Sequence, residues 1–361
     1  MNKKNKYDLI ILGAGKSNEE NGHSSLKLVK SGLNALDWLI HLYSNLNVKY
    51  YFVGGYQIDQ IKSKYLNFNF IINNNWLKTG AAGSLLLMDT IDKTEHIVSY
   101  SDILYRDTTI KKLIKSNERI TIVIDSLWKE RYLGRSMQDL KKSEKVSIVN
   151  NSIVRLGADI DLEIASAEFI GLVKFGKGVL KKIKSDIQVD SKYLNTGNLS
   201  RLIEWSRING EKIDFIDIQG DWAELDDPKD LAHFILGTKA ETLKRLKPIL
   251  KNSIILDQYS FSVSDWITNK KLIISQIADA FKEKSVVIRS SAKNEDSFSS
   301  ANAGVYESIL NVPKNQKIVL SKSINKVIDS YGNTNREDQV LVQPMLKDVK
   351  ISGVLFTRTL S

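Results

Sequence analysis

The order of apolar and polar residues in the first part of the chain predicts strands joined by helices. Residues 7–13 form a short apolar run that ends at a glycine, which indicates a buried strand of a parallel sheet. From residue 36 to residue 46, apolar residues recur at spacings of three and four, so one face of a helix packs on that sheet. Strands separated by helices favour βαβ crossovers and a mostly parallel, doubly wound α/β fold. The other strands predicted in this region are residues 50–53, 68–72, 96–100, 120–124, 168–175 and 213–218.

A change in pattern near residue 245 divides the chain into two expected domains, residues 1–245 and residues 246–361. Residues 239–251 are basic and contain a proline, so we interpret them as the linker. Shortly before them, Asp227 as an N-cap and Pro228 at the first helical position predict the start of a helix.

The second region has its own succession of strands and helices. The predicted helices are residues 272–281 and 318–331, and the predicted strands are residues 286–289, 339–343 and 351–357. The sequence stops directly after the last of these strands. We therefore expect an α+β domain that is incomplete as it stands.

Composition restricts the classes of protein to which the chain can belong. Of its 361 residues, 42% are hydrophobic and 26% are charged, which is typical of folded globular proteins. The absence of cysteine excludes disulfides, thiolate metal sites and a catalytic thiol, and we expect a cytoplasmic location. No apolar run approaches the length of a membrane span, so we expect none.

The formal charge of +10 has two interpretations, binding of a polyanion or a surface rich in lysine. The lysines are scattered and no nucleic-acid motif accompanies them, so we expect no nucleic-acid partner. A small phosphorylated substrate would still be attracted. The four histidines lack the spacing of zinc ligands, and we interpret His23 as a solvated loop residue.

The turn after the first strand carries Gly13, Ala14, Gly15 and Lys16. Glycines there let backbone N–H groups approach phosphates, and the lysine adds a positive charge. The turn matches neither the phosphate-binding loop of P-loop proteins nor the full dinucleotide fingerprint. A glycine turn needed only for packing is the alternative.

Two acidic residues are candidate magnesium ligands. Asp102 follows an apolar strand, at the end where open α/β sheets bind ligands, and Asp226 could join it if the chain folds back. Two carboxylates with Mg²⁺ would polarise an α-phosphate for in-line attack. The alternatives are a helix cap for Asp102 and a turn residue for Asp226.

Several stretches of the first region follow one another in a set order. They are Leu12-Gly13-Ala14-Gly15, Leu26-Lys27-Leu28-Val29, Tyr51-Phe52-Val53-Gly54-Gly55, Asn73-Asn74-Asn75-Trp76, Ser101-Asp102, Glu168-Phe169-Ile170-Gly171-Leu172 and Trp222-Ala223-Glu224-Leu225-Asp226. In this order they resemble the nucleotidyltransferases that activate sugar phosphates and phosphocholine-like alcohols with a nucleoside triphosphate. The resemblance covers about residues 7–240 and implies a Rossmann-like fold.

This resemblance implies a role for each matching position. Backbone groups of the glycine turn wrap the triphosphate, Lys27 neutralises it, and Lys174 reaches the substrate phosphate. The residues implied to contact the nucleotide are Gly13, Ala14, Gly15, Lys16, Gly80 and Ser84, and those implied to hold Mg²⁺ are Asp102 and Asp226. The family's arginine after the glycines and its proline before the lysine are absent here, so Lys16 is a candidate substitute.

The second region carries Arg289 at the end of a predicted strand, followed by hydroxyl-bearing and acidic residues. With the later stretches Val342-Gln343-Pro344 and Ser352-Gly353-Val354, it resembles the nucleotide-binding domain of pyruvate phosphate dikinases and phosphoenolpyruvate synthases, an ATP-grasp-like fold. The resemblance implies that Arg289 contacts ATP phosphates and that the region of Gly304 forms a lid. The family's second half of the site and its phosphohistidine domain are absent, so a fragment would need the remaining kinase domains in cis or in trans.

Together these features predict a Mg²⁺-dependent transfer of a nucleotidyl group, with CTP preferred by analogy, to a small phosphorylated acceptor with release of pyrophosphate. The neighbouring kinase-like module suggests a role in decorating surface polysaccharides. The alternative is an ATP-dependent phosphotransferase, for example one resembling a glutamine kinase, with a degenerate N-terminal nucleotide-binding domain.

Overall fold

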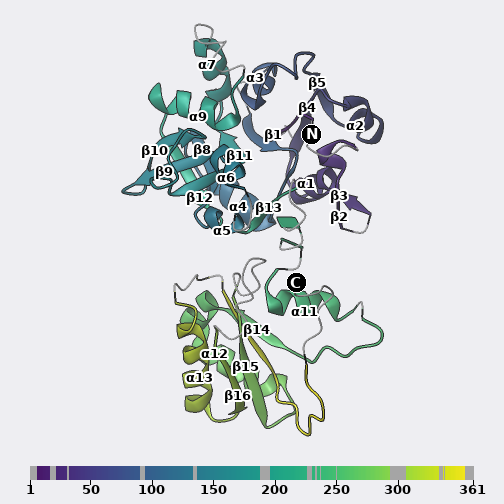
Figure 1. Ribbon diagram of the computed structural model, residues 1–361, viewed down its shortest axis with the longest axis vertical. Helices are drawn as coiled ribbons and strands as arrows, with labels where there is room; N and C mark the ends of the chain where they lie inside the picture. Colours follow the sequence, from purple (N-terminus) through teal and green to yellow (C-terminus); the bar gives the residue numbers. More distant parts are fainter. Residues whose placement is uncertain are drawn as a thin grey trace. The chain divides into compact units, whose positions relative to one another are not determined.

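The chain folds into two compact units, Met1–Ile235 and Leu236–Ser361 (Figure 1). The computed structural model describes residues 6–16, 22–30, 32–89, 94–132, 136–187, 196–225, 230–231, 234–235, 237–248, 250–292, 306–332, 336 and 338–353. No helix in these ranges is both long enough and apolar enough to cross a bilayer. The predicted helix start at Asp227 and Pro228 lies outside the described residues.

A nine-stranded sheet forms the centre of the described part of the first unit. Its strands are β1 (Tyr7–Gly13), β4 (Val48–Gly54), β5 (Asn69–Ile72), β6 (Glu95–Tyr100), β8 (Ile120–Asp125), β9 (Lys145–Val149), β10 (Ser152–Gly157), β11 (Ala167–Phe175) and β12 (Ile213–Asp217). Strand β1 pairs in parallel with β4 and β6, and β4 with β5, while β12 pairs in parallel with β8. Strand β11 runs antiparallel between β6 and β8. The expected mostly parallel α/β sheet is confirmed, with an antiparallel strand inside it.

Helices cover both faces of this sheet, as the apolar character of β1 requires. Successive residues of a strand face opposite sides, so Ile10 packs in one buried cluster and Leu9 and Ile11 pack in another. The helices are α1 (Ala35–Tyr43), α2 (Ile58–Lys64), α3 (Ala81–Leu86), α4 (Asp107–Lys115), α5 (Trp128–Arg131), α6 (Met137–Lys142), α7 (Val179–Asp186) and α9 (Leu199–Ile208). Two small ladders lie outside the sheet, β2 (Leu28–Lys30) with β3 (Leu33–Asn34) and β7 (Ile103–Tyr105) with β13 (Trp222–Glu224).

The second unit is a four-stranded antiparallel sheet in the order β14-β17-β15-β16. Its buried core joins the sheet to two helices through residues such as Ile277, Ile288, Ile324 and Val342. The elements are α11 (Lys239–Leu246), β14 (Tyr259–Ser262), α12 (Val263–Ala280), β15 (Ser285–Ser291), β16 (Ser308–Pro313), α13 (Lys317–Asp329) and β17 (Gln339–Pro344). Residues 351–353 form no strand, and the rest of the strand predicted at residues 351–357 lies outside the described residues.

Helix α11 occupies most of the segment that the sequence assigned to a linker, and that prediction is wrong. Thr238 and Glu241 form a reciprocal capping box that starts the helix. The buried Ala240 donates its N–H to Oγ of Ser291 and accepts at its carbonyl from Gln258. These bonds hold α11 on the second unit, which is why the structure divides the chain about ten residues before the expected boundary near residue 245.

Gly171 lets β11 pack closely against the end of β6. Its φ of +87° is a left-handed conformation, and a Cβ there would lie 2.2 Å from the Tyr100 ring. The pairing of β11 with β8 shifts register between Phe169 and Val173, around this glycine. The backbone at Gly171 therefore makes room for the ring of Tyr100.

We expect Gly171→Ala to lower the free energy of unfolding by about 2–4 kcal/mol, because a left-handed backbone and a steric clash add together. Urea unfolding followed by circular dichroism measures this effect. The matched control is Gly210→Ala, since Gly210 has a φ of +90° but open space where its Cβ would lie. Equal losses in the two variants would show that the contact with Tyr100 contributes nothing.

Candidate active site

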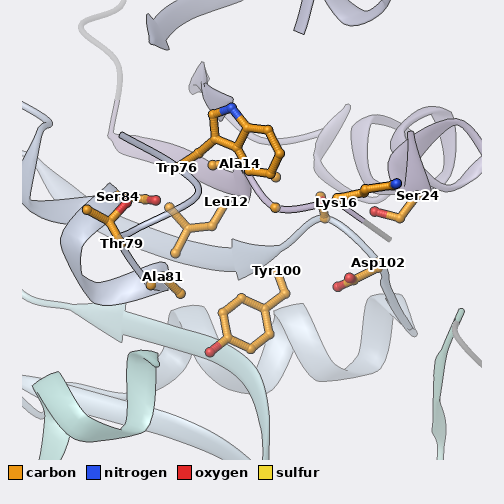
Figure 2. Close-up of a pocket in the computed structure, with 14 residues that line it drawn as sticks. Leu12, Ala14, Lys16, Ser24, Trp76, Thr79, Ala81, Ser84, Tyr100 and Asp102 are labelled. Carbon is orange, nitrogen blue, oxygen red and sulfur yellow. The ribbon is translucent and has the colours of Figure 1, made fainter. Parts of the chain in front are cut away.

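A pocket of about 330 Å³ opens where β1 and β6 end, at the carboxyl edge of the sheet (Figure 2). This is the edge at which open α/β sheets bind ligands. Its lining residues come from the end of β1 and the turn after it, from Ser24, from the end of β6 and the turn after it, and from residues 76–84, which lead into α3. They are Leu12, Gly13, Ala14, Gly15, Lys16, Ser24, Trp76, Thr79, Gly80, Ala81, Ser84, Tyr100, Ser101 and Asp102.

The two glycines of the turn differ in what they do. A Cβ on Gly13 would lie 2.5 Å from Cζ of Phe52 and 2.9 Å from Oγ of Ser101, so Gly13 is required for packing. A Cβ on Gly15 would meet nothing within 4 Å, and the backbone of Gly15 does not adopt a positive φ. Packing within the described protein therefore does not explain Gly15, and the space beside its backbone is open to a ligand.

His23 lies behind this turn, and the interpretation that it is a solvated loop residue is wrong. Its side chain is buried, and its Nε2 lies 2.8 Å from the carbonyl oxygen of Gly13. Burial lowers the pKa of His23.

One end of the pocket is charged. Figure 2 shows Lys16, Ser24 and Asp102 on the same side, away from Thr79 and Ser84. A cation and a carboxylate at one end suit a triphosphate with its metal ion.

Backbone hydrogen bonds bring distant segments to this charged end. Leu225 donates its N–H to the carbonyl of Asp102 at 2.8 Å, and it accepts at its own carbonyl from Nζ of Lys27 at 2.6 Å. Asp226 follows Leu225 directly but lies outside the described residues. The structure thus brings Asp102, Lys27 and the residue before Asp226 together.

The other end of the pocket is uncharged. Asn73 donates to Oγ1 of Thr79 at 2.7 Å and to Oγ of Ser84 at 2.9 Å, which fixes both hydroxyls. A Cβ on Gly80 would lie 2.1 Å from the carbonyl oxygen of Gly197, so only glycine fits at the start of α3. A planar group with hydrogen-bonding edges, such as a base, suits this end.

Of Trp76 and Trp205, only Trp76 is among the described residues that line this pocket. Trp76 lines it and lies against the backbone of Gly55, where a Cβ would come within 2.5 Å of the indole. Trp205 packs instead against the buried core of the sheet.

Lys174 does not lie at the pocket, so the substrate role implied for it does not fit its position. Because β11 runs antiparallel to β6, Lys174 pairs with Ile97 near the start of β6, at the opposite edge of the sheet. Its buried Nζ donates to the carbonyl of Ser116 and lies 3.9 Å from Oε1 of Glu95. Burial lowers the pKa of Lys174.

The structure contains a buried ion cluster at the carboxyl edge that the sequence does not predict. Arg131 lies 3.1 Å from Glu168, 2.5 Å from Asp230 and 3.6 Å from Glu224, and its guanidinium stacks 3.7 Å from the ring centroid of Trp222. Burial raises the pKa of Glu168 to about 8. The cluster joins α5, β11 and β13, so it holds in place the strand that leads to Leu225.

A second buried pair supports the wall of the pocket. Tyr100 donates its hydroxyl to Oε1 of Glu144 at 2.6 Å and accepts from the N–H of Leu199. The other oxygen of Glu144 accepts from the N–H of Ser200 at the start of α9. Burial raises the pKa of Glu144. These partners are distant in the sequence, and no local signal points to them.

In the second unit, Arg289 lies on β15 with its half-buried side chain on the opposite face from Val286 and Ile288. Its cross-strand neighbours are Leu341 and Ser308. The expected lid around Gly304 lies outside the described residues.

Comparison with known proteins supports both sequence resemblances. Residues 181–361 match the family model "Pyruvate phosphate dikinase, AMP/ATP-binding domain". The CTP:phosphoglutamine cytidylyltransferase of Campylobacter jejuni is 31% identical over 200 residues, which cover 50% of this chain and 78% of that protein. Both expected families are thereby confirmed.

One solved structure shares the fold of the matched part of this chain. A putative glucose-1-phosphate thymidylyltransferase from Bacillus anthracis is 13% identical with a TM-score of 0.50, over 63% of this chain and 93% of its own. The inositol-1-phosphate CTP transferase from T. maritima is 18% identical with a TM-score of 0.49, over 63% of this chain and 96% of its own. At this identity the first of these likenesses shows a shared fold alone.

We expect Gly15→Ala to leave folding intact and to raise the KM for a nucleoside triphosphate about tenfold, because the new methyl group enters space that phosphates use. The free energy of unfolding should change by less than about 0.5 kcal/mol. Gly353→Ala is the matched control, since Gly353 also faces open space without a positive φ. An unchanged KM in Gly15→Ala would remove the turn from the nucleotide site.

Proposed function

This chain belongs to the cytidylyltransferase family of its Campylobacter relative and, over residues 181–361, to the pyruvate phosphate dikinase AMP/ATP-binding family, and we propose that its first unit transfers a cytidylyl group from CTP to a small phosphorylated acceptor. The observation that carries this proposal is that the two ends of the pocket differ in charge. Its Asp102 end is charged, its Ser84 end is not, and both lie at the carboxyl edge of the sheet.

The acceptor that we propose is an amino-acid amide phosphate such as phosphoglutamine, the compound in the name of the relative. An acceptor phosphate oxygen attacks the α-phosphorus of CTP and forms a new P–O bond. The bond between the α-phosphorus and its bridging oxygen breaks, and pyrophosphate leaves. Positioning and charge neutralisation are what this reaction needs from the protein.

Each pocket segment has a distinct part in this proposal. The backbone of Gly13–Gly15 receives the triphosphate, and the segment from Gly80 to Ser84 receives the base. Lys16 supplies positive charge at the phosphate end. Lys27 orders Leu225 through its hydrogen bond and adds a second positive charge near Asp102.

Asp102, the acidic residue that lines the described pocket, suits Mg²⁺ as a ligand. Within the described residues no three histidine or acidic side chains gather as a complete metal site, and Asp102 is the acid among those that line the pocket. Mg²⁺ in proteins is commonly held by one or two carboxylates together with substrate phosphates. We propose Asp102 as one ligand and Asp226 as the second; bound Mg²⁺ would supply charge neutralisation for the phosphates.

The match over residues 181–361 favours a second activity, ATP-dependent phosphorylation. We propose that Arg289 contacts ATP phosphates and that a dikinase-type module supplies the phosphorylated acceptor to the first unit. A cytidylyl-activated product of this kind would serve the decoration of surface polysaccharides.

Release of pyrophosphate tests the proposal directly. We expect release from CTP with phosphoglutamine, and slower release with phosphocholine, with a sugar 1-phosphate, or when UTP, GTP or ATP replaces CTP. Nucleotide binding without release for every pair would favour the alternative, in which the first unit is degenerate and the second defines the protein.

We expect Asp102→Asn to lower kcat by a factor on the order of 10²–10³ and to raise the Mg²⁺ concentration needed for half-maximal activity, because several kcal/mol of charge stabilisation is lost. Pyrophosphate release at varied Mg²⁺ measures both quantities. Asp107→Asn is the matched control, since Asp107 is exposed and pairs with Lys111. Full activity in Asp102→Asn would exclude a metal role for Asp102.

A further inference from the structure

His23 connects two segments that both line the pocket. It is 3% exposed, and its Nε2 lies 2.8 Å from the carbonyl oxygen of Gly13. On the other side of the ring, Nδ1 accepts from the backbone N–H of Ser25 at 3.2 Å and from its Oγ at 2.7 Å. Gly13 and Ser24 line the pocket and His23 does not, so the ring supports the pocket from behind.

The partners of the ring fix its protonation. A carbonyl oxygen can only accept a hydrogen bond, so Nε2 carries the proton that is shared with Gly13. A backbone N–H can only donate, so Nδ1 carries none. His23 is therefore a neutral imidazole in a single tautomer, with both nitrogens in use.

The bond to Gly13 also sets the direction of the next peptide N–H. In a planar trans peptide the C=O and the N–H point to opposite sides. With the Gly13 oxygen turned toward His23, the N–H of Ala14 points away from the imidazole, and Ala14 itself lines the pocket. Neither the N–H of Ala14 nor that of Gly15 donates to a backbone carbonyl among the described residues.

The imidazole packs closely against the turn and against Phe52. A Cβ on Gly13 would lie 3.1 Å from Cε1 of His23, and the ring centroid lies 5.7 Å from that of Phe52. The same residue begins the short helix from Ser24 to Leu26, after which the backbone N–H of Lys27 donates to the carbonyl of Ser24. The side chain of His23 thus connects the glycine turn with the segment that leads to Lys27.

We propose that His23 is a positioning residue for nucleotide binding: its Nε2–H holds the Gly13–Ala14 peptide so that the Ala14 N–H is directed at a phosphate of the nucleotide. The proposal rests on the proposed function. The two nitrogens of the ring have separate roles. Nε2 orients the phosphate donor, and Nδ1 caps the short helix.

Two variants separate these tasks. In His23→Gln, the amide nitrogen reaches the place of Nε2 and keeps the bond to Gly13 but loses the cap. In His23→Asn, the amide oxygen takes the place of Nδ1 and keeps the cap but has no donor that reaches Gly13. The melting temperature reports the cap, and the KM for CTP in pyrophosphate release reports the orientation of the peptide.

We expect His23→Gln to keep a KM for CTP within about threefold of the wild type, and His23→Asn to raise it about tenfold, since one oriented hydrogen bond to a charged group is lost. The KM for phosphoglutamine should stay unchanged in both. The melting temperatures should rank the other way. His23→Asn should melt at a higher temperature than His23→Gln, because it keeps the cap of the short helix. His41→Gln is the control, because His41 is exposed on α1, and it should change neither quantity.

A purely structural role gives a different pattern. If the KM for CTP follows the melting temperature, or is equal in the two variants, the proposal is wrong. Ser25→Ala keeps the ring and its bond to Gly13 and provides a third measurement: a tenfold rise in its KM for CTP would also overturn the proposal. Absence of pyrophosphate release in the wild type would instead contradict the proposed function, and the two failures are therefore distinguishable.

Discussion

The two hydrogen bonds of Leu225, to Asp102 and to Lys27, are the contacts on which the candidate site depends. Leu225 lies about 120 residues after Asp102 and about 200 residues after Lys27 in the sequence. Strand β13 is brought to this place by its pairing with β7 and by the ion cluster of Arg131. Without this return of the chain, Asp102 would stand alone at the end of β6, and a second carboxylate could not approach it.

The direction of the strands decides which residues can share the site. The parallel strands β1 and β6 place the glycine turn and Asp102 at one edge of the sheet. The antiparallel β11 sends Lys174 to the other edge while it brings Glu168 to the carboxyl edge. A residue near the end of a strand therefore belongs to the site only when that strand is parallel to β1. The apolar pattern of β11 does not reveal the direction of the strand.

Local signals in the sequence predicted much of the fold and part of the site. The apolar run of β1 and the glycines after it located the turn, and the position of Asp102 after a strand located the charged end. The capping box of Thr238 and Glu241 was also visible in the sequence and would have predicted α11 in place of a linker. The burial of His23 and the partners of Arg131 could not be predicted, because they depend on contacts between residues far apart in the chain.

We propose that the carboxyl edge holds CTP with its triphosphate on the glycine turn and its metal ion at Asp102. A crystal structure of the protein with a non-reactive CTP analogue and Mg²⁺ tests this most directly. We expect phosphate density against the backbone of Gly13–Gly15, the base between Trp76 and Ser84, and the ion in contact with Asp102. A nucleotide bound outside this pocket, or an ion away from Asp102, would contradict it.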